Sequence, residues 1–220
     1  METDFWSPVK LSIEVASVAG ILVLILGLFF SKMMANTKFK GKAVVETIFL
    51  LPLVLPPSVV GFLLIVLFGR NSVVGQLIEW IFKQPVMFTW WAAVIASTVV
   101  AFPLMYQSAK SGFEAIDEDI ENAARVDGAN EYQLFLTISI PLSLKAIISG
   151  TILSFARALG EFGATLMFAG NIPGKTQTIS TAIYIAMDSG NMDLAWFWVM
   201  CLVAISFFML IGLQLMNLKN

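Results

Sequence analysis

The chain has 220 residues, of which 58% are hydrophobic and 13% charged, and its formal net charge is −2. Ordinary globular domains carry about 25% charged residues, so a mean hydropathy of +0.85 excludes a typical soluble domain and indicates a membrane protein. The chain has no histidine and one cysteine, Cys201, which excludes an internal disulfide and a Cys/His metal site. Residues 1–8 lack a basic region and a cleavage site, so we expect no removable signal peptide.

Five apolar segments are long enough to cross a membrane, because a helix of about 20 residues spans a hydrocarbon core of about 30 Å. We therefore predict an all-α membrane protein with about five transmembrane helices. No repeat or soluble insert interrupts them, so residues 9–217 are predicted to form a single transmembrane domain. The predicted spans are Val9–Ser31, Thr47–Phe68, a stretch within Gln84–Ala109, Leu142–Phe168 and Leu194–Asn217.

The second span contains Pro52, Pro56 and Pro57. Proline lacks a backbone N–H and interrupts a helix, and such breaks are tolerated in membranes where neighbouring protein or a cavity satisfies the backbone. Two interpretations stay open: a bend near a gate that lines a translocation path, or a kink that serves packing alone.

The fourth span contains two charges four residues apart, Arg157 and Glu161. Intramembrane charges are costly and are functional candidates by default. In one interpretation Arg157 lines a path and attracts an anion while Glu161 holds the guanidinium in place. In the other, the pair locks helix packing. A strong cationic site would trap an anion that must leave, which favours the second.

Two shorter segments lie between the spans. Asn71–Lys83 has apolar residues near helical spacing and is predicted to lie on the membrane surface. Asn171–Asp193 includes TISTAIYIAM, which is too short to span and is predicted to be a re-entrant or interfacial helix. Four tryptophans at span ends are predicted to be interfacial: Trp90, Trp91, Trp196 and Trp198.

Residues 112–141 form the one long polar interval, and they are predicted to fold into two short helices around a glycine. Asp117 is a candidate N-cap for the first helix, and Gly128 stands where a left-handed glycine would end it. Asn130 and Gln133 have the spacing of a capping box for the second helix, which Pro141 should stop or kink.

Basic residues predict the orientation, since loops rich in lysine and arginine stay in the cytoplasm. The side with more basic residues carries Lys32, Lys38, Lys40, Lys42, Lys110, Arg125, Lys145 and Lys219, and the other carries Lys10, Arg70, Lys83 and Lys175. We therefore expect the N-terminus outside, and the polar interval and the C-terminus in the cytoplasm.

The polar interval resembles the EAA loop of bacterial ABC-importer permeases. The residues that fit the spacing of that loop are Ala123, Ala124, Gly128, Ile138 and Pro141. Asn122 occupies the position of the glutamate, with Glu121 one residue earlier, and Ile140 replaces a leucine. The resemblance implies coupling to a separate ATPase subunit through Glu121, Asn122, Ala123, Ala124, Arg125 and Gly128.

Three other stretches are similar to molybdate permeases: GEFGATLMFAGNIPGKTQT at 160–178, LPLVLPPSVVGFLL at 51–64 and FPLMYQ at 102–107. The resemblance implies a type I ABC importer permease in the bacterial cytoplasmic membrane that translocates molybdate. It also implies a homodimer, ATP-binding cassette ATPase subunits, an extracellular or periplasmic molybdate-binding protein and no nucleic acid. The candidate path residues are Pro56, Pro57, Arg157 and Glu161.

No catalytic residue and no cofactor are expected in this chain. AGNIPGKT at 169–176 fits a relaxed phosphate-loop pattern, but a phosphate loop needs a preceding strand and a following helix, and here a span precedes it. The alternatives are a sulfate or tungstate permease of the same family, a secondary transporter driven by an ion gradient, and a simple channel or structural subunit. A secondary transporter usually shows internal repeats, and none is visible.

Overall fold

The computed structural model describes residues 5–218, with side chains through Leu215. Regular structure in this part of the chain consists of helices alone, as predicted. The helices are α1 (Trp6–Ala35), α2 (Lys42–Val54), α3 (Pro57–Phe68), α4 (Val73–Phe82), α5 (Trp90–Glu114), α6 (Glu118–Val126), α7 (Glu131–Leu134), the π-helical η1 (Phe135–Ser139), α8 (Ile140–Leu142), α9 (Leu144–Leu159), α10 (Gly163–Phe168), α11 (Ile179–Asp188) and α12 (Met192–Leu218).

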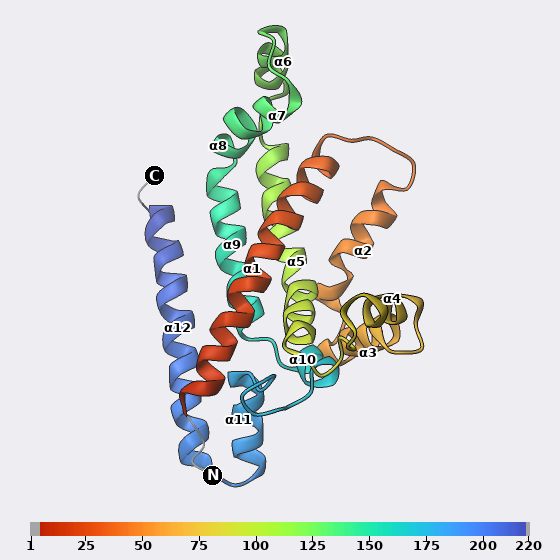
Figure 1. Cartoon of the computed structure of the whole chain (residues 1–220). Coiled ribbons are helices and arrows are strands. Elements are labelled where there is room, and N and C mark those ends of the chain that lie inside the picture. Colours follow the sequence, from red (N-terminus) through yellow and green to blue (C-terminus); the bar gives the residue numbers. More distant parts are fainter. Residues whose placement is uncertain (1–4, 219–220) are drawn as a thin grey trace.

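Helices α1, α5 and α9 form the centre of the bundle (Figure 1). Small residues let their backbones approach closely, as is common between membrane helices. At Gly27 of α1, an added Cβ would lie 2.5 Å from Cγ of Met105 on α5, and at Gly150 of α9 it would lie 2.8 Å from Cβ of Ser108. The buried faces of these helices are therefore defined by close packing and leave no room for larger side chains.

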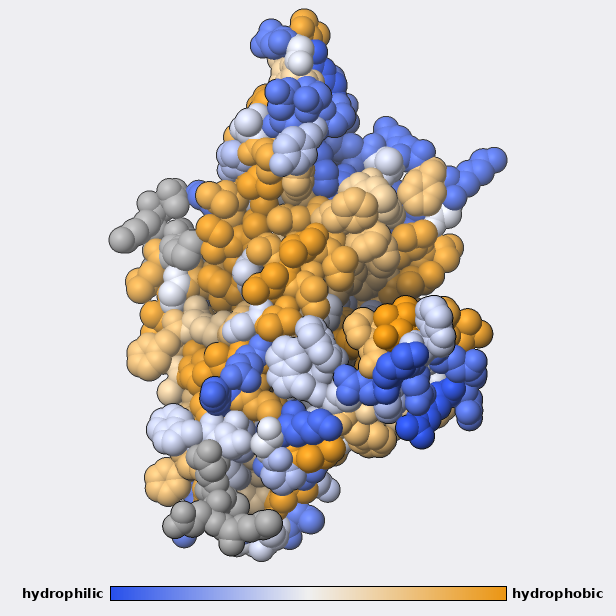
Figure 2. Space-filling view, viewed as in Figure 1, coloured by the Kyte–Doolittle hydropathy of each residue, from blue (hydrophilic) through white to orange (hydrophobic). Residues whose placement is uncertain are grey.

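The first, third and fifth predicted segments correspond to single helices that could cross a membrane, whereas the second and fourth are broken. α1, α5 and α12 are each long and apolar enough to span alone. α2 and α3 meet at an angle of 119°, and α9 follows residues 131–142 at 76°. Figure 2 shows the apolar band that covers the middle of the molecule, with polar residues above it. Lys219, which entered the charge comparison, lies outside the described residues.

The break between α2 and α3 lies at Leu55 and Pro56, whose backbones are extended with ψ of 141° and 137°. Each of these residues precedes a proline, and a residue before proline disfavours the helical region. Pro57 then starts α3 at a position where a missing N–H costs nothing. Pro52, by contrast, lies inside α2 without ending it.

The fourth predicted span is not one continuous helix. α9 ends at Leu159, residues 160–162 are not helical, and α10 begins at Gly163. Glu161 therefore lies beyond the end of α9 and not one turn along the same helix, as the sequence had suggested. The second polar helix bends directly after Pro141 and Leu142, as predicted, since residues 131–142 meet α9 at 76°. It continues through Pro141 to Leu142, because the wider π-helical turn of η1 precedes the proline and accommodates its missing amide.

The two shorter predicted helices are present as α4 and α11. α11 packs against α12 and α1, and the N–H of Ile179 donates to the hydroxyl of Ser12 at 2.7 Å. Trp198 is buried within the chain (4% exposed), and its indole N–H donates to the carbonyl of Phe5 at 3.0 Å. Trp196, two residues earlier, is 61% exposed.

Gly61 provides a test of the close contact between α3 and α10. A Cβ at this position would lie 2.9 Å from Cβ of Met167 and 3.1 Å from the backbone of Ala164. We expect Gly61→Ala to lower the stability of the purified protein by about 1–3 kcal/mol, the usual cost of overpacking. The matched control is Gly212→Ala, because a Cβ there meets no atom within 4 Å. Thermal unfolding in detergent checks the prediction, and equal melting temperatures for both variants would contradict it.

Candidate coupling and translocation sites

The polar interval forms a helical hairpin that protrudes from one end of the bundle (Figure 1). Helix α6 starts at Asp117, whose carboxylate accepts the N–H of Asp119 at 3.0 Å. Gly128, two residues after the last residue of α6, has a φ of +93°. There the N–H of Gly128 donates to the carbonyl of Arg125, and that of Ala129 to the carbonyl of Ala124. These two bonds form a Schellman motif, so the predicted C-terminal glycine is confirmed.

The second helix starts with the predicted capping box. The N–H of Gln133 donates to Oδ1 of Asn130 at 2.9 Å, and the N–H of Asn130 donates to Oε1 of Gln133 at 3.0 Å. Between the two helices, Nε of Arg125 lies 2.7 Å from Oε1 of Glu131. Both ends of the turn are therefore closed by specific bonds, and the angle between the two helices is well defined.

Glu121 is the buried charge of this hairpin and is only 3% exposed. Its Oε1 lies 2.6 Å from Nζ of Lys32, at the end of α1, and accepts a hydrogen bond from the hydroxyl of Ser139 in η1 at 3.0 Å. Nζ of Lys32 also donates to that hydroxyl at 2.9 Å. Three segments far apart in sequence thus meet at one carboxylate, which ties the hairpin to the central helix α1.

The surroundings of Glu121 favour its charged form. Burial alone would raise the pKa of Glu121, but hydrogen bonds from Lys32 and Ser139 outweigh it and lower the pKa. In the exposed pair, the hydrogen bond between Arg125 and Glu131 raises the pKa of the guanidinium and lowers that of the carboxylate. Exposed pairs contribute little to stability, so the buried contact is the stronger of the two anchors.

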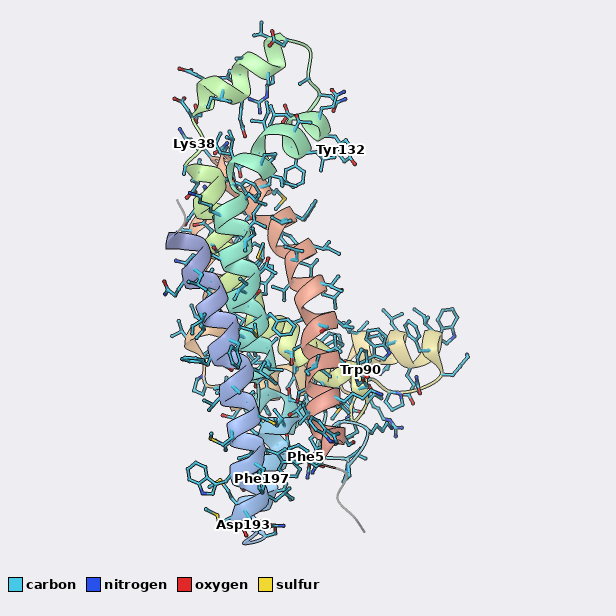
Figure 3. All side chains as sticks on the ribbon, turned by 90° about the vertical axis from the view of Figure 1, so that its left-hand side faces the viewer. Phe5, Lys38, Trp90, Tyr132, Asp193 and Phe197 are labelled. Carbon is cyan, nitrogen blue, oxygen red and sulfur yellow. The ribbon has the colours of Figure 1, made fainter. Side chains whose placement is uncertain are left out.

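Asn122 and Arg125, which are also predicted coupling residues, are exposed. Nη1 of Arg125 donates to the side chain of Asn122 at 3.1 Å, so the residue in the position of the family's glutamate is held by a neighbour on the same helix. Val126 and Tyr132 are 87% and 72% exposed. Figure 3 shows Tyr132 pointing away from the bundle at this end. The hairpin thus presents an exposed apolar and polar surface, while Glu121 points inward.

The candidate path residues gather at the two helix breaks. Nη1 of Arg157 lies 2.8 Å from Oε2 of Glu161, and Oε1 of Glu161 accepts the N–H of Ala164 at 2.8 Å. Glu161 is buried (1% exposed), whereas 30% of the Arg157 side chain is exposed. A Cβ at Gly163 would lie 2.9 Å from Cβ of Pro57. The break between α9 and α10 therefore packs directly against the break between α2 and α3.

The sequence did not identify two of the residues that organise these sites. Lys32 entered only as a charge that reports orientation, and Ser139 had no signal because a lone serine in an apolar helix is common. A second ionic contact was also missed: Nζ of Lys110 on α5 lies 2.6 Å from Oε1 of Glu46 on α2. The contacts Lys32–Glu121, Ser139–Glu121 and Lys110–Glu46 each join residues that are distant in sequence.

The buried contact at Glu121 can be tested with two lysines of α1. Lys32→Met should destabilise the protein by on the order of 3 kcal/mol, because it leaves a buried carboxylate without its partner. Lys32→Met combined with Glu121→Gln should cost less, since no unpaired charge is left. Lys10→Met is the control, because the Lys10 side chain is exposed and its Nζ is as far as 3.9 Å from Oε1 of Glu14. Hydrogen exchange of residues 118–134 and thermal unfolding measure the effect, and equal results for the two lysines would refute this anchor.

Comparison with known proteins shows which family the chain belongs to. The sequence pattern of the binding-protein-dependent transport system inner membrane component matches residues 15–219. YvgM of Bacillus subtilis (strain 168), named for a molybdenum transport system permease, is 64% identical over 212 residues, which cover 96% of this chain and 93% of the relative. The molybdenum transport system permease protein ModB of Escherichia coli (strain K12) is 45% identical over 185 residues, covering 84% and 80%.

Solved structures support the same fold at low sequence identity. A bacterial ABC transporter involved in the import of alginate matches with a TM-score of 0.76 and 16% identity, covering 100% of this chain and 80% of the other. The MetNI methionine ABC transporter, in inward-facing conformations, matches with a TM-score of 0.76 and 17% identity, covering 98% and 97%. The chain thus has the type I ABC importer permease fold, and it belongs to the family of binding-protein-dependent transport system inner membrane components.

Proposed function

We propose that this chain is the membrane-spanning subunit of an ABC importer that carries molybdate into the cell. The observation that carries the importer assignment is the rigid helix–Gly–helix hairpin, held by the Schellman motif at Gly128 and anchored to α1 through Glu121. The substrate rests on the names of the relatives, several of which are molybdenum transport permeases. ATP hydrolysis then belongs to a partner subunit, and this chain needs neither a catalytic residue nor a cofactor.

The hairpin is the proposed contact with the ATPase. Its outer surface includes Ala123, Val126 and Tyr132, which are exposed. Because Glu121 joins the hairpin to α1 and η1, a movement of the docked hairpin would pass directly to the bundle. In this proposal Glu121 transmits the movement, and its exposed neighbours make the contact.

The translocation path is proposed to run past the two helix breaks. Broken helices that meet within a transporter are typical of substrate pathways. Pro56 and Pro57 are exposed, and part of the Arg157 side chain is also exposed. These residues lie on the surface of a single chain, so a second copy is needed to enclose them. None of the residues of α2 is fully buried, so α2 offers an apolar surface for that copy.

The proposed orientation places the hairpin in the cytoplasm and the N-terminus outside. Lys32 and Lys110 lie toward the hairpin end of α1 and α5, and Lys10 lies at the opposite end of α1. Figure 3 shows Lys38 near the hairpin and Phe5 and Asp193 at the opposite end. The basic residues are therefore distributed along the bundle in the way that the positive-inside rule requires. An extracellular or periplasmic binding protein would dock at the end near α11.

Transport measurements distinguish this function from its alternatives. The chain, reconstituted in liposomes with an ATP-binding cassette ATPase and a molybdate-binding protein, should take up molybdate only with ATP, and uptake should persist when ionophores collapse ion gradients. Elemental analysis by mass spectrometry measures uptake of molybdate, tungstate and sulfate in parallel. Preferential uptake of sulfate would identify the chain as a sulfate permease of the same family. Uptake driven by an ion gradient without the ATPase would refute the importer assignment.

Gly128 tests the coupling role of the hairpin. A Cβ at this position meets nothing within 4 Å, so the expected effect of Gly128→Val comes only from its φ of +93°. The strain of about 1–2 kcal/mol per left-handed residue should reorient α7 relative to α6 without preventing membrane insertion. Co-elution with the ATPase and ATP turnover should therefore fall, and Gly128→Asn should be milder because asparagine tolerates this region.

The matched control for Gly128 is Gly190→Val. Gly190 also has a positive φ, of +77°, and no neighbour within 4 Å, but it lies between α11 and α12 at the other end of the bundle. It should carry the same local strain and leave co-elution with the ATPase unchanged. If the Gly128→Val variant co-elutes with the ATPase and supports ATP turnover like wild type, the hairpin is not the rigid coupling element.

A further inference from the structure

Helix α2 is loosely attached to the bundle, whereas its neighbour α5 is firmly packed. None of the residues of α2 is fully buried. Figure 1 shows α2 at the side of the bundle, joined to α1 by a loop at the hairpin end and continuing into α3 at its other end. An added Cβ at Gly27 of α1 would lie 2.5 Å from Cγ of Met105 on α5. An added Cβ at Gly112 of α5 would lie 2.7 Å from Cβ of Ala146 on α9. α5 is therefore a fixed support for α2.

Ring contacts and an ion pair hold α2 on this support. The ring of Phe49 lies 5.5 Å from that of Phe102 and 5.2 Å from that of Tyr106, measured between centroids. Nearer the hairpin end of both helices, Oε1 of Glu46 lies 2.6 Å from Nζ of Lys110. The ion pair is thus the contact that holds α2 against α5 closest to the hairpin.

The ion pair belongs to a row of four alternating charges. Lys42 lies one turn before Glu46 on α2 at 3.8 Å, and Glu114 lies one turn after Lys110 on α5 at 3.4 Å. Only 23% of the Glu46 side chain and 19% of the Lys110 side chain are exposed. A network with partly buried members is screened less than an isolated surface pair. The pair should therefore bias the position of α2 measurably.

Both ends of α2 are places where the backbone can turn. At Leu55 and Pro56 the backbone is extended, and α2 meets α3 there at 119°. At the other end Gly41 has a φ of +99°, and an added Cβ there meets nothing within 4 Å. Hinges consist of a few such residues at the ends of elements. α2 can therefore rotate as one body while Gly61 keeps α3 packed on α10.

Lys110 stands between the hairpin and α2. α5 ends at Glu114, one turn after Lys110, and Asp117 already caps the first helix of the hairpin. A movement of the docked hairpin would pass along this short connection to the end of α5. Whether α2 follows that movement depends on the ion pair of Lys110 with Glu46.

We propose that Glu46 and Lys110 are positioning residues of transport, whose ion pair latches α2 against α5 at the hairpin end. When the pair separates, α2 turns about Leu55 and Pro56 and widens the path beside the exposed Pro57. The two charges become hydrated, and no proton is transferred. This inference rests on the proposed function, because that function assigns the path to the break between α2 and α3.

Passive leak tests the latch without ATP. The full chain is assembled with the ATPase in liposomes preloaded with molybdate, and efflux is followed by elemental analysis. Lys110→Met combined with Glu46→Gln removes the pair and leaves no unpaired charge, so the protein should still fold. We expect efflux to rise about fivefold, as when one partly buried pair no longer biases an equilibrium. Efflux equal to that of wild type would overturn the proposal.

Two further variants separate the latch from a general loss of stability. Lys110→Arg keeps the charge and should leak no more than wild type. Arg70→Met combined with Glu79→Gln removes a different ion pair, which joins α4 to the preceding loop with Nε and Oε2 3.7 Å apart. It should also leak like wild type, and thermal unfolding checks that each variant is folded. A leak from this control as large as that from the latch variant would contradict the proposal.

Reversible cross-linking tests whether holding α2 in place closes the path. Glu46→Cys and Lys110→Cys are combined with Cys201→Ser, because Cys201 is the one cysteine of the chain. A bifunctional methanethiosulfonate reagent joins the two thiols, and a reducing agent releases them. Cross-linking should lower efflux to the wild-type level and abolish ATP-dependent uptake, and reduction should raise efflux again. Variants with only one of the two cysteines should not respond. Unchanged efflux after complete cross-linking would refute the latch.

The same liposomes distinguish failure of the latch from failure of the proposed function. ATP-dependent uptake of molybdate by wild type tests the proposed function, and its absence would contradict that function. The efflux comparisons use no ATP, so they test the latch by themselves. Normal uptake by wild type with equal efflux from all variants would leave the importer assignment intact and overturn the latch alone.

Discussion

The structure depends on one constraint: backbone polar groups within an apolar environment must be satisfied by the protein itself. Within residues 5–218 this makes every regular element a helix and restricts the places where a helix can end. The break after α9 is tolerated because the carboxylate of Glu161 accepts the N–H of Ala164. The break before α3 uses Pro57, which has no N–H to satisfy. The two interruptions pack against each other, with Gly163 against Pro57.

The same constraint explains why the hairpin is joined to the bundle through a buried charge. Glu121 would be costly in an apolar contact without partners, because desolvation penalises an unpaired charge. Lys32 and Ser139 supply those partners from α1 and η1. A carboxylate with these two specific contacts has one favourable position, which an apolar side chain would not have. The hairpin is thereby fixed relative to the central helix.

The residues at the periphery of the bundle are less buried than those at its centre. None of the residues of α2 is fully buried, and α2 is held on α5 by the ion pair of Glu46 with Lys110 and by ring contacts of Phe49 with Phe102 and Tyr106. The proposed path lies at such edges. A single chain therefore has the fold of a permease, while the enclosure of its path depends on what packs against those edges.

The sequence alone was sufficient for features that depend on a few neighbouring residues. Apolar length predicted the spans, and the spacing of Asp117, Gly128 and Asn130 predicted the caps of the hairpin. Consecutive prolines predicted the break before α3. These features follow from local backbone geometry. The tertiary structure alone decided that Glu121 points inward to Lys32, 89 residues away in sequence, and that Pro57 meets Gly163. Such contacts depend on how helices pack, and hydrophobic periodicity does not specify which faces of an almost uniformly apolar chain meet.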